Sequence, residues 1–217
     1  MSDIFREVDE EVRREQLKKL WERYSIFIIA AAVLFVAGIA AWRGYDYLEG
    51  KKAAEAGARF ENALTLSEQG KHAEAEAEFA KLSKESTSGY RTLSRFAEAG
   101  QLAQRDPKAA IAAYDALAAD NTLPLLQRDL AAIRAGLLMA DNSPYAEVQR
   151  RLEPLTAADR PFRHTARELL AFSAWRGGDA AAARRWYDMM ITDSDTPAST
   201  RSRVEVLIAL MPEQGKG

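Results

Sequence analysis

The chain has 217 residues, 47% of them hydrophobic, which is enough for a membrane anchor and one domain with its own core. The 30 lysines and arginines are balanced by 32 aspartates and glutamates, so the chain lacks the basic excess of nucleic-acid-binding proteins. The absence of cysteine excludes disulfides, thiolate catalysis and cysteine-ligated metals. His72 and His164 are far apart and complete no zinc pattern, so we expect no cofactor and no metal.

Residues 1–24 are rich in charge and predict an amphipathic helix. Apolar residues, among them Phe5, Val8 and Val12, recur at roughly helical spacing, and acidic residues give way to basic ones along the segment. This order suits the helix dipole, and pairs such as Glu15 and Lys19 have the stabilising i,i+4 orientation. The segment is either a solvated lead-in helix or a helix that contacts the membrane surface or a partner.

Residues 25–42 read SIFIIAAAVLFVAGIAAW, 18 residues without a charge. As an α-helix this segment reaches about 27 Å, close to the thickness of the hydrocarbon core of a bilayer. Tyr24 and Trp42 bracket it at the positions where aromatic side chains anchor a helix at the two interfaces. A buried core helix would carry a polar stripe, and a signal peptide would have a shorter leader and apolar region. We therefore predict a single transmembrane helix at 25–42.

The basic residues on the two flanks of this segment give its orientation. The N-terminal flank carries Arg13, Arg14, Lys18, Lys19 and Arg23, and the C-terminal flank carries Arg43, Lys51, Lys52 and Arg59. The bias is slight, and by the positive-inside rule it favours a cytoplasmic N-terminus. Residues 1–24 are then a cytoplasmic helix, and the remainder of the chain lies across the membrane.

Beyond the apolar segment, glycines interrupt an alanine-rich helical pattern at Gly44, Gly50 and Gly57. They predict a junction at 43–51, the alternative being a helix that continues unbroken. From residue 52 onward no stretch alternates apolar and polar residues over the length of a strand, whereas helical spacing is widespread. We therefore predict an all-α domain at 52–211, followed by a loose tail at 212–217.

A triplet of a small, a large and an apolar residue recurs four times in this domain with i, i+4, i+7 spacing. The triplets are Ala75–Phe79–Leu82, Ala110–Tyr114–Leu117, Val148–Leu152–Leu155 and Ala183–Tyr187–Met190. The first and second are 35 residues apart, as are the third and fourth, and the middle step is 38. Such a triplet is typical of the contact face of the second helix in a helix-turn-helix pair.

The first helix of each pair is marked by a small residue that permits close packing. These residues are Ala63, Ala99 or Gly100, Gly136 and Ala171. Asp106, Ser143 and Asp179 are placed to cap second helices. The pattern resembles the tetratricopeptide repeat, which implies a solenoid of about four helix pairs, and residues 197–210 predict a helix that caps it.

The sequence contains no glycine-rich phosphate loop, no GxSxG or HExxH motif and no cysteine nucleophile, so we predict a non-catalytic protein without a small-molecule substrate. A stack of helix pairs has a concave surface lined by the first helices, and such surfaces bind proteins. In the fourth pair the residues that would line this groove are Thr165, Glu168, Phe172, Trp175 and Arg176. Phe172 and Trp175 are candidate anchors for a partner, or else they pack against the final helix.

The opening DIFREVDEEVRREQLKKLWERY, the apolar segment after it and the alanine-rich repeats together resemble the ancillary SecYEG translocon subunit family of Gram-negative bacteria. The resemblance implies an inner-membrane protein with its repeat domain in the periplasm. It also implies translocon subunits and periplasmic chaperones as partners. Two other hypotheses fit the same architecture: an envelope scaffold for cell division or polymer secretion, and a regulator that restrains a signalling protein.

Overall fold

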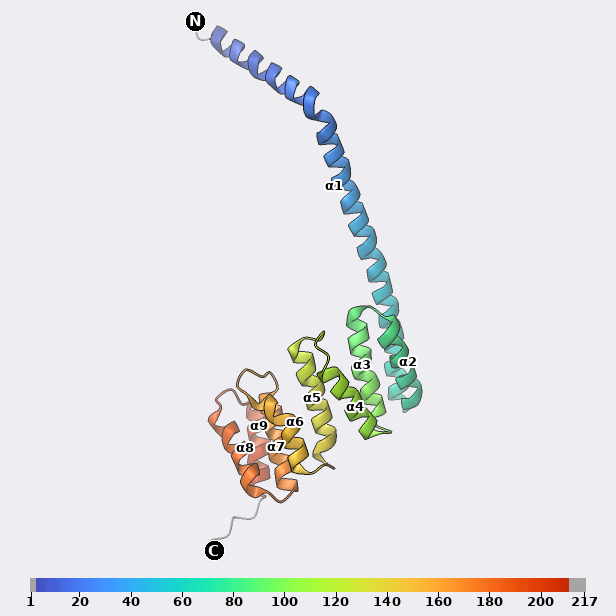
Figure 1. Ribbon diagram of the computed structural model, residues 1–217, viewed down its shortest axis with the longest axis vertical. Helices are drawn as coiled ribbons and strands as arrows, with labels where there is room; N and C mark the ends of the chain where they lie inside the picture. The colour runs from blue at the N-terminus through green and yellow to red at the C-terminus, as the bar shows by residue number, and fades with distance from the viewer. Residues whose placement is uncertain (1–2, 211–217) are drawn as a thin grey trace. The chain divides into compact units, whose positions relative to one another are not determined.

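The computed structural model describes residues 3–210, and their side chains except those of residues 3–12, 16, 17 and 20. Over this range the regular elements are helices and no strand is present, which confirms the predicted all-α class (Figure 1). The chain divides into two compact units, Met1–Ala54 and Glu55–Gly217. The predicted tail at 212–217 lies outside the described residues.

Helix α1 (Asp3–Glu68) is a continuous helix of 66 residues. Residues 43–51 lie within it, so the structure contains the unbroken helix that was the alternative to a junction at the glycines. Most of the predicted amphipathic face at 3–24 falls on side chains outside the described ones. Among those described, Lys19 Nζ lies 3.9 Å from Glu15 Oε2, and both side chains are exposed.

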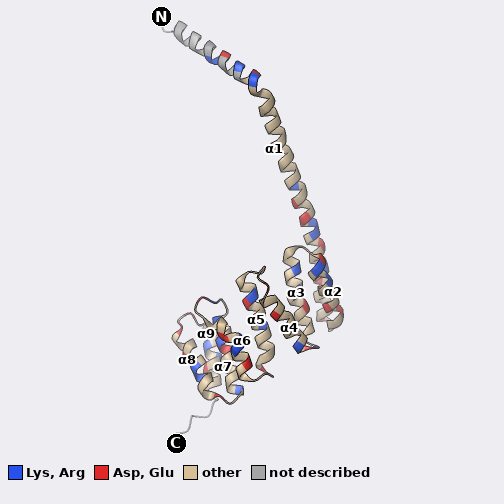
Figure 2. Ribbon diagram, in the orientation of Figure 1, with Lys and Arg blue, Asp and Glu red and all other residues tan. Residues whose placement is uncertain are grey.

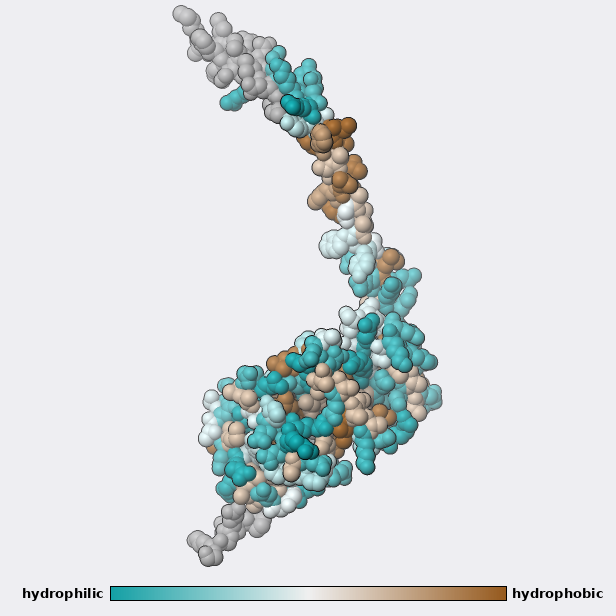
Figure 3. All heavy atoms as spheres, in the orientation of Figure 1, coloured by the Kyte–Doolittle hydropathy of each residue, from teal (hydrophilic) through white to brown (hydrophobic). Residues whose placement is uncertain are grey.

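The first unit contains a stretch of α1 that is long and apolar enough to cross a membrane. None of that stretch is buried, and large side chains such as Ile26 and Phe35 stay exposed. Figure 2 shows it as an uninterrupted tan segment without charge, and Figure 3 shows its hydrophobic side chains in brown. In water, apolar surface of this extent is unfavourable by about 25 cal/mol per Å².

The second unit begins with the end of α1 and continues through eight further α-helices and one 3₁₀ helix within the described residues. They are α2 (His72–Glu85), α3 (Ser88–Leu102), α4 (Pro107–Ala118), α5 (Leu125–Ala140), α6 (Tyr145–Leu152) with η1 (Glu153–Thr156), α7 (Arg163–Arg176), α8 (Ala180–Thr192) and α9 (Ala198–Ala209). The end of α1 pairs with α2, α3 with α4, α5 with α6 and α7 with α8, and α9 packs on α7 and α8 (Figure 1). This is the predicted solenoid of four helix pairs and a final helix.

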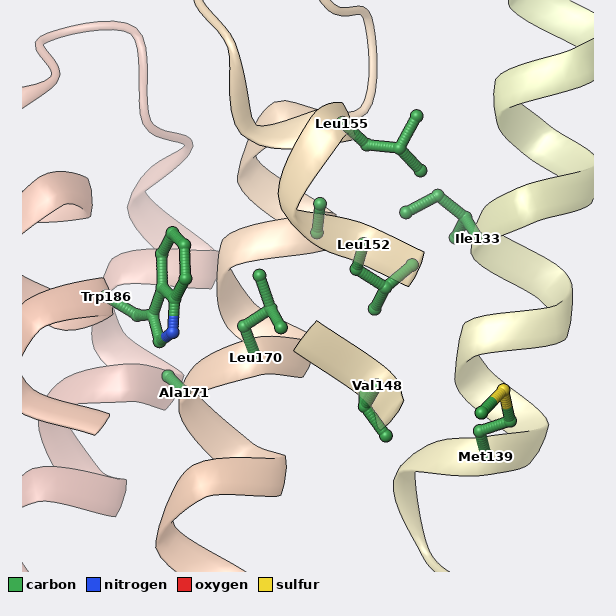
Figure 4. Close-up of a cluster of buried hydrophobic side chains, with 9 residues drawn as sticks. Ile133, Met139, Val148, Leu152, Leu155, Leu170, Ala171 and Trp186 are labelled. Atoms are coloured by element: carbon green, nitrogen blue, oxygen red, sulfur yellow. The ribbon is translucent and has the colours of Figure 1, made fainter. Parts of the chain in front are cut away.

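The triplets of the second helices form the core of these pairs. Every member except Tyr187 is buried. In the fourth pair Trp186 takes that place in the core, where it is 7% exposed and its Nε1 donates to the Tyr145 hydroxyl at 2.8 Å. Figure 4 shows Trp186 with Leu170, Leu152 and the other members of this cluster. The helical spacing was therefore correct, and in the fourth triplet only the large position shifts by one residue, from Tyr187 to Trp186.

Small residues of the first helices allow close approach within a pair, as predicted. Ala63, Ala99 and Ala171 are fully buried. At Gly136 of α5 an added Cβ would lie 2.6 Å from Leu152 Cδ2, closer than two carbon atoms can approach. Two of the three predicted caps are confirmed, because Asp106 accepts a hydrogen bond from the Ala109 N–H and Asp179 accepts one from the Ala182 N–H. The prediction for Ser143 is wrong, because Pro144 occupies the N-cap of α6 and no described side chain caps that helix.

Candidate protein-binding surface

The five residues predicted to line a groove lie on α7, the first helix of the fourth pair. Thr165 and Arg176 are exposed, whereas Glu168, Phe172 and Trp175 are half-buried. Helix α7 is held in place by its opposite side, where Leu170 and Ala171 are buried in the core shared with α5, α6 and α8 (Figure 4). The structure therefore leaves the predicted positions partly accessible, and their hydrogen bonds decide what each can do.

Glu168 is bound to the final helix. The Arg203 guanidinium of α9 donates from Nε to Glu168 Oε1 at 2.6 Å and from Nη2 to Oε2 at 2.8 Å. This two-point contact with a carboxylate fixes geometry as well as contributing energy. The same contact raises the pKa of Arg203. Glu168 thus ties α9 to α7, and its carboxylate is already engaged within the domain.

Arg176 is bound to the preceding helix pair. Its Nε donates to the Ala140 carbonyl at 2.9 Å, and its Nη2 donates to the Ser143 carbonyl. Ala140 is the last residue of α5, where backbone carbonyls have no partner within the helix. Arg176 therefore caps the C-terminal end of α5, although it lies more than 30 residues further along the chain, and it links the third pair to the fourth.

Phe172 and Trp175 contact each other at the surface of α7. Their ring centroids are 6.3 Å apart and the ring planes are inclined by 55° to each other. Trp175 also packs on the buried alanines Ala174, Ala182 and Ala183 at the α7–α8 turn, together with Tyr145. The pair is anchored on one side and open on the other, which is the arrangement of an aromatic interface residue.

A second exposed apolar surface lies on α5 and was missed from the sequence. Leu126, Leu130, Arg134 and Leu137 follow one another at i, i+4, i+8 and i+11, and we name these four residues the α5 face. Leu126 is 56% exposed and Leu137 is 49% exposed, Arg134 is exposed and Leu130 is half-buried. The sequence did contain a signal for this surface, because the leucines of α5 are spread over more sides of the helix than the core contacts.

A polar network fixes the loop between α8 and α9. Asp193 Oδ2 accepts from Arg167 Nη1 at 2.7 Å and from Arg163 Nε at 3.0 Å. These hydrogen bonds, that from Arg163 first, hold the pKa of Asp193 well below its usual range. Arg167 is only 6% exposed, and its Nη2 also donates to the Thr156 carbonyl at 2.8 Å. The network joins α7, η1 and the α8–α9 loop.

His164 of α7 belongs to the same network. Its Nδ1 lies 3.0 Å from Thr196 Oγ1 and 3.9 Å from Asp193 Oδ2. Burial lowers the pKa of His164, and the nearby Arg163 lowers it further, although Asp193 opposes them. The neutral imidazole is therefore the form that this site favours.

The predicted membrane-interface residues lie on α1. The Tyr24 and Trp42 side chains are exposed, and the Arg23 guanidinium lies 5.9 Å from the centre of the Tyr24 ring. Their role at the two interfaces stays a prediction. Among the residues that the structure describes, no three histidine, aspartate or glutamate side chains gather in a manner that would hold a metal ion.

In a comparison with protein-family models, residues 18–208 match the tetratricopeptide repeat-like domain. The match spans all four helix pairs and most of α9. No curated protein matches the chain, and no solved structure does. The repeat interpretation of the four triplets is therefore confirmed at the level of this domain family.

Proposed function

The chain belongs to the tetratricopeptide repeat-like family, and from that premise we propose that it is a membrane-anchored scaffold that binds other proteins. Domains of this kind generally mediate protein–protein interaction without catalysis. One observation carries the proposal: an exposed, uncharged stretch of α1 shares the chain with a repeat domain whose α7 presents the half-open Phe172–Trp175 pair.

The anchor is the first part of the proposal. Exposed apolar side chains along α1 favour lipid over water, and Tyr24 and Trp42 flank the uncharged stretch as interface residues do. We place the protein in the bacterial inner membrane as a single-pass protein, with its N-terminus in the cytoplasm and its repeat domain in the periplasm. The slight excess of basic residues before the apolar stretch and the family resemblance support this orientation.

The partners are the second part. We propose that the protein is an ancillary subunit of the protein-export translocon and links it to periplasmic chaperones. The charged opening, the single apolar stretch and the alanine-rich repeats support this role, since all three resemble the translocon subunit family. In this role α1 contacts translocon subunits, and Phe172 and Trp175 contact a chaperone or an exported chain.

In-cell photo-crosslinking tests both parts. A photoreactive residue replaces Tyr24 in one variant and Trp175 in another, and the captured proteins are identified by mass spectrometry. A third variant with the photoreactive residue at Arg184, exposed on the second helix α8, serves as the control. We expect translocon subunits from position 24, chaperones or exported chains from position 175, and neither from position 184.

Other outcomes contradict the proposal at different levels. Capture of only division or polymer-export proteins, or of only a kinase or response regulator, overturns the export role and leaves the scaffold. Capture of no protein from position 175 overturns the binding role of α7. A reporter fused after Gly217 that is active in the cytoplasm and silent in the periplasm overturns the orientation.

A further inference from the structure

Helix α5 has more apolar sides than its place in the solenoid requires. One side, with Ala131 and Ala135, packs in the core of the second helix pair. Another side, with Ile133 and Met139, packs in the core of the third and fourth pairs. The α5 face is a third apolar side, on which Leu126 and Leu137 are each about half exposed. An interior solenoid helix normally needs only two packed sides and exposes polar residues elsewhere.

The position of Leu137 links the α5 face to the surface on α7. Leu137 precedes Phe172 by 35 residues, the interval that separates the third triplet from the fourth. The two residues therefore occupy equivalent positions on successive first helices. Arg176 of α7 binds the carbonyl of Ala140 at the end of α5, which keeps the two helices adjacent along these sides. An apolar surface thus extends from the fourth pair to the third.

Arg134 gives the α5 face its charge. It is exposed between Leu130 and Leu137, and no carboxylate of the described residues lies within ion-pair distance of it. The arginines nearby in the solenoid are used differently, since Arg151 pairs with Asp115 and Arg160 pairs with Asp129. A guanidinium between a half-buried and an exposed leucine is complementary to a carboxylate that is itself flanked by apolar residues.

We infer that the α5 face binds an amphipathic helix of a partner protein, with a glutamate or aspartate directed at Arg134. The stripe from Leu126 to Leu137 is straight and about 17 Å long at helical rise, which is the length of three turns of a partner helix. Its i, i+4 ridge offers the packing surface that a second helix uses. The described residues contain no strand to which an extended peptide would add by backbone pairing.

This inference deepens the proposed scaffold function, on which it rests, and it does not depend on the export role. It assigns the third helix pair a chemically defined ligand, a helix with large apolar residues on one side and a central acid. The surface on α7 has no such charge requirement, because Glu168 and Arg176 are engaged within the domain.

The test uses the full chain in lipid nanodiscs and a pair of fluorescent 16-residue helical peptides. Both peptides carry leucines at i, i+4 and i+11, with glutamate at i+8 in one and lysine in the other. Fluorescence anisotropy should show that the glutamate peptide binds about tenfold more tightly, the preference that one partly desolvated charge pair provides. The Arg134→Glu variant should instead bind the lysine peptide more tightly than the glutamate peptide. Each peptide enters the lipid of the disc to the same extent with either form of the protein, so this background does not affect the comparison.

Two further variants complete the design. Leu137→Asp should weaken binding of both peptides by about tenfold or more, because it places a carboxylate in the apolar contact. Val206→Asp, at an exposed apolar position of α9, should leave both affinities unchanged. All three substitutions are at exposed positions, and far-ultraviolet circular dichroism checks that helix content is retained.

The contrary results are specific. An unchanged preference in Arg134→Glu, or unchanged affinities in Leu137→Asp, overturns the inference. If position 175 captures partners in cells while the peptides show no dependence on Arg134, the inference fails and the scaffold function stands. If position 175 captures nothing while Arg134→Glu reverses the peptide preference, the α5 face is supported and the binding role of α7 fails.

Discussion

The first and fourth helix pairs have the same arrangement and an apolar core, and they differ in the contacts that are added to that core. In the first pair Phe60 of α1 contacts Phe79 of α2 at 5.1 Å and Tyr90 of α3 at 5.9 Å between ring centroids. Its charged contacts, such as Arg59 with Glu85, lie at the surface. In the fourth pair the nearly buried Arg167 joins three segments.

The difference teaches that the repeat specifies a contact geometry and leaves the chemistry of the contact open. Small residues at the points of closest approach occur in both pairs, at Ala63 and Ala75 in the first and at Ala171 and Ala183 in the fourth. Outside these points, the first pair adds contacts between aromatic rings, and the fourth pair adds the hydrogen bonds of a nearly buried arginine. We therefore expect the two pairs to respond differently to substitution, salt and pH.

The largest effect should come from Phe79→Ala in the first pair. Phe79 is 0% exposed and contacts Phe60, so its truncation should lower the free energy of unfolding by about 3–5 kcal/mol. Urea unfolding of the solubilised chain measures the loss, and hydrogen exchange should show α2 losing protection before α8. Equal loss of protection in α2 and α8 would contradict independent stabilisation of the two pairs.

Arg167→Met should be the next largest. It preserves apolar bulk but removes the donors to Asp193 and to the Thr156 carbonyl, which should lower the free energy of unfolding by about 2–3 kcal/mol. Hydrogen exchange should localise the loss to α8 and α9. Arg184→Met, at an exposed position of α8, is the matched control and should stay within about 0.5 kcal/mol of the unaltered chain. If Arg167→Met has the same free energy of unfolding and the same hydrogen exchange as the unaltered chain, the buried network is not needed for stability.

A smaller effect is expected from Glu168→Gln. The Arg203 side chain is mostly exposed, so loss of this ion pair should cost about 0.2–1 kcal/mol. The difference from the unaltered chain should shrink in 1 M salt, a condition in which the screening length is about 3 Å. Hydrogen exchange of α9 at low and at high salt measures this difference in stability. Salt-independent loss of protection would point to packing rather than charge.

The smallest effect should be a dependence on pH in the fourth pair. The pKa of His164 is lowered from 6.5 in the folded chain by burial and by Arg163, so the unfolded state binds more protons near that pH. The stability contributed by neutral His164 is present above about pH 6.5 and decreases as the pH falls below it. Unfolding midpoints between pH 7.5 and 5 measure the slope, and His164→Gln should flatten it. A slope that is unchanged in this variant would assign the pH dependence to other groups.

The repeat domain was predictable because its signal is a repeated pattern of buried positions. A contact face is predicted by the first triplet, Ala75, Phe79 and Leu82, and the later triplets repeat its spacing. The residues of this first triplet are buried in the structure. The exchange of Tyr187 for Trp186 was not predictable, since the two aromatic residues are adjacent and differ by about 100° around the helix. Contact with Tyr145, on another helix, selects the tryptophan.

The continuous helix α1 shows a different limit of prediction from sequence. Glycines at 44, 50 and 57 predict a break because each costs about 1 kcal/mol in a helix. An added Cβ at Gly57, however, would lie 2.7 Å from the Tyr90 hydroxyl of α3. That glycine makes room for a tertiary contact inside a continuous helix, and the contact is invisible in the sequence of α1 alone.

The candidate surface was only partly predictable for the same reason. Thr165, Phe172 and Trp175 were placed on an accessible side of α7 from periodicity. The partners of Glu168 and Arg176 lie more than 30 residues away along the chain, so their engagement depends on the fold. The α5 face was not predicted, because its leucines are interspersed along α5 with apolar residues that are buried, such as Ile133 and Met139.

The unbroken course of α1 through residues 43–54 bears on how the protein is turned over. Proteases cleave most readily where the backbone is exposed and free to become extended, as it is in loop tips. A helix withholds its backbone from such enzymes, and residues 43–54 contain no loop between the apolar stretch and the first repeat. Shedding of the repeat domain by a single cut therefore requires local unwinding of the helix first, which favours a chain that is retained or degraded as a whole.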